Sequence, residues 1–135
     1  MSPRRPRAGL PRPTDAELEI MRVLWRQGPS SVRQVHTSLG ADPDRAPGYT
    51  TVLKLMQIMF EKGLLVRDEG RRPQVYSTRV AQRDTQQQML RHVLERVFGG
   101  SHRALVLQAL ADRNASAAEL REVEALLDRI EGEAV

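Results

Sequence analysis

The chain has 135 residues and a formal net charge of +4, from 21 lysines and arginines against 17 aspartates and glutamates. This length fits one domain, or one small domain with an appendage. The absence of cysteine excludes disulfides, thiolate metal sites, cysteine catalysis and thiol redox sensing. No apolar run approaches the ~18 residues of a membrane span, and none follows the N-terminal arginines as in a signal peptide. We therefore expect a cytoplasmic protein.

Charge is divided unevenly along the chain. Residues 1–80 carry 14 basic and 8 acidic side chains, whereas residues 81–135 carry 7 basic and 9 acidic ones. This asymmetry predicts a first half that contacts a polyanion, with a solvated basic surface as the alternative. Aromatic residues make up only 4% of the chain, which disfavours the stacking platforms of single-strand-binding proteins.

The N-terminal residues predict a basic arm followed by a helix. Residues 1–13 hold four prolines, four arginines and no acidic residue, so we expect them to be disordered. Such an arm either contacts DNA or is a solvated tail. Thr14 and Glu17 then have the spacing of a capping box, which predicts the start of a helix that ends at Gly28.

Two further helices are predicted before residue 64. Ser31 and Gln34 form a second capping-box pattern, and Gly40 ends that short helix. A third helix is expected from Tyr49 to Lys62, with Gly63 just beyond its C-terminus. Its buried stripe is predicted to consist of Val52, Leu55, Met56 and Met59.

The hydrophobic period then changes from that of a helix to that of a strand. Residues 64–66 and 74–77 are predicted to be short strands on either side of a polar turn at 68–73. Three short helices followed by a hairpin are typical of a winged helix-turn-helix. The fold class is therefore mainly α with a small β-wing, and residues 14–80 are predicted to form a winged-helix DNA-binding domain.

Residues 81–135 are predicted to form a helical dimerisation domain. Helices are expected at 81–98 and 102–111, separated by Gly99-Gly100, and a last helix begins at a capping box of Ser116 and Glu119. These 55 residues cannot bury so much apolar surface alone, so a second copy is favoured over packing onto the first domain. The predicted dimerisation residues are Leu90, Val93, Leu94, Val97, Leu105, Leu120, Val123 and Leu127.

No pattern in the sequence fills a catalytic or cofactor role. The three histidines, His36, His92 and His102, lack metal-ligand spacing, and neither a nucleophile motif nor a phosphate-binding glycine loop is present. We therefore expect no enzyme activity, no cofactor and no metal.

The third helix and the hairpin carry the residues expected to face DNA. In a winged helix the third helix enters the major groove, and Thr50, Thr51, Lys54 and Gln57 lie outside its buried stripe. Arg71 and Arg72 lie at the hairpin tip, within reach of backbone or minor groove. The alternatives are a helix cap for the threonines and a solvated turn for the arginines.

A family resemblance rests on several short motifs in a fixed order. These are Thr14-Asp15-Ala16-Glu17, Leu24-Trp25, Tyr49-Thr50-Thr51-Val52, Glu61-Lys62-Gly63-Leu64-Leu65, Gly70-Arg71 and Val75-Tyr76. They resemble the BlaI/MecI/CopY family of bacterial repressors from residue 14 to about residue 130. The resemblance implies a homodimeric winged-helix repressor on an inverted repeat of the TACA/TGTA type. It also implies control of genes for β-lactam resistance or related stress responses.

The resemblance also implies residue roles. The base-contacting helix begins at Thr50 and Thr51 and includes Lys54, and the wing includes Arg71 and Arg72. With Tyr49 and Gln57, these complete the predicted DNA-binding set.

Two departures from the family pattern concern its regulation. Copper-sensing members end in cysteine pairs, which this chain lacks, so it resembles the BlaI branch. In β-lactam-responsive members, a membrane sensor's protease system causes cleavage of an Asn–Phe bond. The matching run here ends in Gln108-Ala109, so the region is present without the scissile pair.

The sequence thus predicts a repressor that occludes a palindromic operator. A non-specific architectural DNA- or RNA-binding protein is the first alternative. A protein-interaction winged helix that binds no nucleic acid is the second.

Overall fold

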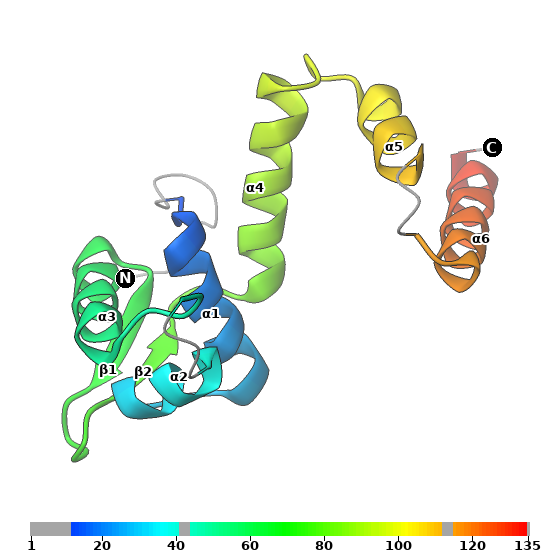
Figure 1. Cartoon of the computed structure of the whole chain (residues 1–135). Coiled ribbons are helices and arrows are strands. Elements are labelled where there is room, and N and C mark those ends of the chain that lie inside the picture. The colour runs from blue at the N-terminus through cyan, green and yellow to red at the C-terminus, as the bar shows by residue number, and fades with distance from the viewer. Residues whose placement is uncertain (1–11, 41–43, 112–114, 135) are drawn as a thin grey trace. The chain divides into compact units, whose positions relative to one another are not determined.

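The computed structural model describes residues 12–40, 44–111 and 115–134. Within these ranges the chain forms six helices and one two-stranded sheet, which confirms a mainly α fold with a small β-wing (Figure 1). The elements are α1 (Asp15–Gln27), α2 (Val32–Leu39), α3 (Tyr49–Lys62), β1 (Leu65–Asp68), β2 (Val75–Thr78), α4 (Gln82–Arg96), α5 (His102–Ala111) and α6 (Ala117–Ala134).

The chain divides into two compact units, Met1–Leu90 and Arg91–Val135. The boundary falls inside α4, so residues 81–90 of the predicted second domain belong to the first compact unit. One physical link is the indole Nε1 of Trp25, which donates to the carbonyl of Val80 at 3.2 Å and ties α1 to the segment before α4. The division into domains at residue 80 stays a prediction.

All three predicted capping boxes are present. The amide of Glu17 donates to the Thr14 hydroxyl at 3.2 Å, and the Thr14 amide donates to the Glu17 carboxylate at 3.0 Å. Ser31 and Gln34 make the same reciprocal pair at the start of α2. Ser116 makes it with its partner three residues later at the start of α6. These side chains satisfy amides that a helix N-terminus leaves without partners.

The hairpin begins one residue later than predicted. Gly63 adopts the left-handed conformation (φ 89°) expected of a residue that follows a helix. The amide of Leu64 then donates to the Met59 carbonyl at 2.9 Å, so this amide completes the end of α3 and only the Leu64 carbonyl, which accepts from the Arg79 amide at 2.9 Å, bonds toward the second strand. Strand β1 therefore runs from Leu65, which pairs with Thr78, to Asp68, which pairs with Val75.

The glycine break between α4 and α5 is confirmed. Gly99 and Gly100 both have positive φ, at 57° and 84°, a conformation that other residues rarely adopt. The amide of Gly100 donates to the Leu94 carbonyl at 2.8 Å and closes the end of α4. The helix ends at Arg96, two residues before the predicted end, because this capping turn replaces its last residues.

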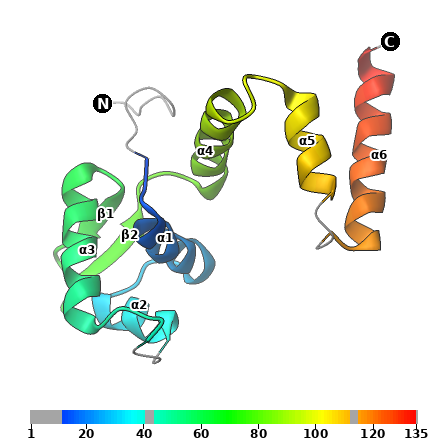
Figure 2. The same cartoon turned by 45° about the horizontal axis from the view of Figure 1, so that its top comes forward.

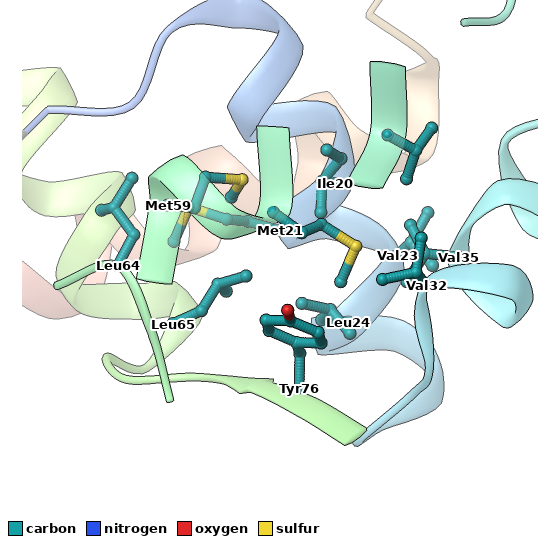
Figure 3. Close-up of a cluster of buried hydrophobic side chains, with 12 residues drawn as sticks. Ile20, Met21, Val23, Leu24, Val32, Val35, Met59, Leu64, Leu65 and Tyr76 are labelled. Carbon is teal, nitrogen blue, oxygen red and sulfur yellow. The ribbon is translucent and has the colours of Figure 1, made fainter. Parts of the chain in front are cut away.

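A single hydrophobic core holds α1, α2, α3 and the hairpin together (Figure 3). Of the predicted stripe on α3, Val52, Met56 and Met59 are fully buried, whereas Leu55 is only partly buried at the edge of the core. The Tyr76 side chain of β2 lies among these residues with 2% of its surface exposed. The core thus fixes which face of α3 is left to solvent.

The wing is also joined to the helix-turn-helix through the backbone. The amide of Ser30 donates to the Tyr76 carbonyl at 2.9 Å, and the amide of Tyr76 donates to the Ser30 carbonyl at 2.8 Å. The turn between α1 and α2 therefore lies along β2, while the hairpin tip extends away from the helices (Figure 1). Figure 2 shows the same unit from a second side, with α3 beside the sheet.

The second compact unit contains the end of α4, α5 and α6. Most of the predicted dimerisation side chains are exposed in the single chain, and Val97 has 69% of its surface accessible. Leu94 is the exception with 7%, and Leu105 and Val123 are half-buried. None of the helices in the described part of the chain is long and apolar enough to cross a membrane.

Some expectations fall on residues that the structure leaves undescribed. The predicted arm at 1–13 lies outside the described residues except for Arg12, which is exposed, and Pro13, which is buried. Because Pro13 is buried, the folded part of the chain begins at least one residue before Thr14, where the sequence predicted it to begin. Residues 112–114, between α5 and α6, also lie outside the described ranges.

A buried ion pair links α1 to the end of α3. The Lys62 ammonium lies 2.8 Å from Oε1 and 2.9 Å from Oε2 of Glu17. The carboxylate side chain is only 4% exposed, whereas that of Lys62 is 34% exposed. Burial alone raises the pKa of Glu17, but hydrogen bonds from Lys62 and from Thr14 outweigh it, so this pKa lies below its ordinary value.

This ion pair predicts a pH-dependent loss of stability in Lys62→Met. Removing the ammonium leaves a buried carboxylate with fewer partners, which should cost about 1–3 kcal/mol at pH 7, since the lysine is partly solvated. Because the native pKa of Glu17 is lowered, its stabilisation is complete above its unfolded pKa and is lost as pH falls through the native one. The difference between variant and wild type should therefore shrink in acid, measured by urea unfolding across pH.

The matched control is Glu17→Gln, which keeps the capping-box hydrogen bonds and buries no charge. It should be less destabilising than Lys62→Met at pH 7. Equal stability of wild type and Lys62→Met at pH 7 would contradict a role for the ion pair.

Candidate nucleic-acid interface

Helix α3 begins without a side-chain cap. Its N-cap is Gly48, whose lack of a side chain leaves the amides of the first turn without a side-chain acceptor. Thr50 and Thr51 are the second and third residues of the helix and are both exposed. The structure thus excludes the alternative in which one of these threonines is only a helix cap.

The exposed face of α3 is a polar stripe. Thr50, Lys54 and Gln57 recur every three to four residues, so they line one face opposite Val52 and Met56. All three of these polar residues are exposed, and each can hydrogen-bond to a base edge or a phosphate. Thr51 lies beside the stripe, nearer to the buried face. The predicted residues of α3 are therefore brought together on one surface.

The stripe ends in an acidic residue. Glu61 lies on the same exposed face, one turn beyond Gln57 and next to the last residue of α3. A carboxylate repels phosphate, whereas the first turn of α3 carries no acidic residue. The electrostatics therefore favour an anion at the N-terminal end of α3 over its C-terminal end.

The two hairpin arginines differ in their contacts. One guanidinium nitrogen of Arg72 donates to the carbonyls of Glu69 and Arg71, at 2.7 and 3.1 Å, and so closes the turn on itself. The Arg71 side chain is exposed, and its guanidinium makes no hydrogen bond or ion pair with the residues that the structure describes. Arg71 is thus open to an external anion, and Arg72 serves first to shape the tip.

A third hairpin arginine is engaged within the fold. The Arg67 guanidinium lies 4.0 Å from the ring centroid of Phe60 and donates to Glu69 at 2.6 Å. Interactions with Tyr76 and then with Glu69 raise the pKa of Arg67 above its ordinary value. It braces the hairpin against α3 and is not part of the open basic surface.

A groove of about 530 Å³ joins α2, α3 and the hairpin. Tyr49, Leu53 and Gln57 of α3 line it, together with both arginines of the hairpin tip. Its remaining wall is the first turn of α2, including Arg33 and Gln34, and the residues from Pro73 to Tyr76. The groove therefore brings together α3 and the hairpin, the two elements predicted to face DNA. It adds residues of α2, which were not predicted to face DNA.

The contribution of α2 was missed, although one signal pointed to it. Arg33 is exposed, and its guanidinium carbon lies 5.3 Å from the ring centroid of Tyr49. The ring of His36 meets the same tyrosine edge-on at 5.9 Å. The signal in the sequence is that the first turn of α2 holds a basic residue and no acidic one. A positive side chain at a helix N-terminus is unfavourable unless something else stabilises it.

The described residues offer no site for a bound metal. No group of three histidine, aspartate or glutamate side chains among them has the arrangement to hold an ion.

Gln108 and Ala109, the pair at the cleavage position that the family resemblance implies, are exposed and lie inside α5. Cleavage at this bond therefore requires local opening of the helix.

Comparison with known proteins matches the chain to one family. The family model described as penicillinase repressor matches residues 13–129. The penicillinase repressor of Bacillus licheniformis is 25% identical over 119 residues, which cover 88% of this chain and 91% of that protein. The methicillin resistance regulatory protein MecI of Staphylococcus aureus is 22% identical over 116 residues, 86% of this chain and 93% of that protein.

A shorter match is closer in sequence. The transcriptional regulator BlaI of Mycobacterium tuberculosis is 43% identical over 65 residues, which cover 46% of this chain and 46% of that protein. The family match spans both the winged helix and most of the helices that follow it. The chain therefore belongs to the penicillinase repressor family of transcriptional repressors.

Proposed function

We propose that this protein represses transcription as a homodimer that binds an inverted-repeat operator and excludes RNA polymerase. One observation carries the proposal: Thr50, Lys54 and Gln57 form an exposed polar stripe on α3, and Arg71 of the hairpin lines the adjoining groove together with Gln57. A helix of this kind fits the major groove, and a basic hairpin tip fits the neighbouring backbone.

The exposed apolar side chains of α4 and α6 and of the turn after α4 support a dimer. Leu90, Val97, Leu120 and Leu127 each have two fifths or more of their surface accessible in the single chain. Apolar surface of this extent is unfavourable in water, and a two-fold symmetric partner removes it. A symmetric dimer also presents two copies of α3, which matches the symmetry of an inverted repeat.

The relatives suggest the class of target gene. The penicillinase repressor and the methicillin resistance regulatory protein are named for resistance to β-lactams. We propose that this chain controls β-lactam resistance genes or related cell-wall and stress genes.

We propose that release from the operator follows cleavage between α4 and α6, initiated by a membrane sensor protease system. A cut there removes α6 with its exposed Leu120 and Leu127 and so weakens the dimer. The Gly99-Gly100 link is an exposed turn outside the helices and is open to a protease, unlike Gln108-Ala109 inside α5. An intact chain during full derepression would exclude this route.

Replacing Thr50 by alanine should weaken operator binding more than random binding. The change removes a hydroxyl from the N-terminal end of the stripe, which should cost about 1–3 kcal/mol on the operator and less on random duplex. The operator is located first by footprinting on the upstream region of the chain's own gene. The matched control is Thr37→Ala, an exposed threonine of α2 outside the groove. If the wild-type protein bound the operator less than ~10³-fold more tightly than random duplex, a non-specific DNA- or RNA-binding protein would be favoured.

The two hairpin arginines should differ in their salt dependence. Arg71→Ala should lower the slope of log K against log salt by about one per protomer, because each phosphate contact contributes about 0.9. Arg72→Ala should change this slope less, since that guanidinium already bonds turn carbonyls. Equal slopes for wild type and Arg71→Ala, measured by titration at several salt concentrations, would remove Arg71 from the interface.

A charge on the exposed apolar surface should break the dimer without unfolding the protomer. Val97→Asp is suited to this, because Val97 is 69% exposed, whereas Leu94 is buried and its substitution would disturb the protomer itself. We expect the variant to be monomeric in light scattering at micromolar concentration, with helix content unchanged in circular dichroism. Operator binding should fall together with the dimer. A monomeric wild type that still binds the operator would contradict the proposed assembly.

A further inference from the structure

The first turn of α2 presents an exposed cation beside the proposed contacts of α3 and the hairpin. Arg33 is the second residue of α2 and is exposed. Its guanidinium carbon lies 5.3 Å from the centroid of the Tyr49 ring, within the range of a cation–π interaction. The arginine is therefore held at the N-terminal end of α3, where that helix begins.

The local electrostatics do not explain this arginine as a structural ion pair. The first turn of α2 carries no acidic residue, and Arg33 makes no ion pair with any carboxylate in the described part of the chain. The partial positive charge of the helix N-terminus disfavours a cation at this position. The Tyr49 ring offsets part of this repulsion but supplies no negative charge, so Arg33 retains its capacity to bind an anion.

The position of Arg33 is continuous with the proposed DNA surface. It lines the same groove as Gln57 of α3 and Arg71 of the hairpin. The Tyr49 ring also makes a T-shaped contact with the ring of His36, at 5.9 Å between ring centroids. The ring that supports the guanidinium therefore has a second partner on α2, and a guanidinium held on such a ring loses less conformational entropy on binding.

We propose that Arg33 binds a backbone phosphate of the same DNA duplex whose major groove receives α3, with Tyr49 as the positioning residue that holds its guanidinium. This inference rests on the proposed function and extends the interface from α3 and the hairpin to α2. A planar guanidinium suits both parts of the role, since it stacks on an aromatic ring and donates to phosphate oxygens.

The test compares Arg33→Gln with Arg22→Gln in the full-length protein. Arg22 is an exposed residue of α1 outside the groove, so its variant loses the same charge without losing the proposed contact. Arg33→Gln should weaken binding about fivefold or more, to a similar extent on operator and random duplex, and lower the salt slope by about one per protomer. Arg22→Gln should leave the slope unchanged.

A double-mutant cycle tests the role of Tyr49. In a Tyr49→Leu background, which removes the ring, Arg33→Gln should weaken binding by a smaller factor than in the wild type. Equal factors in the two backgrounds would overturn the positioning role. If Arg33→Gln and Arg22→Gln gave the same salt slope of the binding constant, the phosphate contact would be overturned. The proposed function would still stand. A wild type without salt-dependent duplex binding would overturn both.

Discussion

The arrangement of the candidate interface depends on the paired backbone of Ser30 and Tyr76. Their two reciprocal hydrogen bonds, at 2.8 and 2.9 Å, hold the turn between α1 and α2 against β2. The Tyr76 side chain extends from the same residue into the core, where it is 2% exposed (Figure 3). One residue thus joins the hairpin to both the turn and the helices, and its two backbone hydrogen bonds hold the hairpin wall of the groove beside the α2 wall.

Helix α3 is anchored at both ends by different chemistry. At its C-terminus Lys62 bonds the buried carboxylate of Glu17 on α1. At its N-terminus Tyr49 meets Arg33 and His36 of α2 through its ring. Between these anchors the fully buried Val52, Met56 and Met59 set the rotation of the helix about its own axis. The direction and the rotation of the exposed stripe are therefore both determined within the first unit, before any DNA is present.

Local signals were readable from the sequence, whereas long-range placement was not. The capping boxes and Gly63 involve residues a few positions apart, so spacing alone predicted them, and the bounds of α3 followed. Arg33 and Tyr49 are far apart in the sequence, with the undescribed residues 41–43 between them. Their contact depends on how α2 packs on α3, which no local pattern encodes. Arg71 and Arg72 are adjacent and chemically identical in the sequence, and only the fold of the turn separates an open cation from one bonded to carbonyls.

The number of open cations also explains why the proposed repressor requires two copies. Lys54, Arg71 and Arg33 would give about three phosphate contacts per protomer, so a monomer would lose about 40-fold in affinity between 50 and 200 mM salt, and a dimer about 2,000-fold. The same counting means that a monomer gains little binding free energy from phosphate at physiological salt. Loss of the exposed apolar contacts of Val97 and Leu127 would then remove half of the cations together with the second α3. Dimer stability and operator affinity are thus expected to be linked, although the residues for each lie in different compact units.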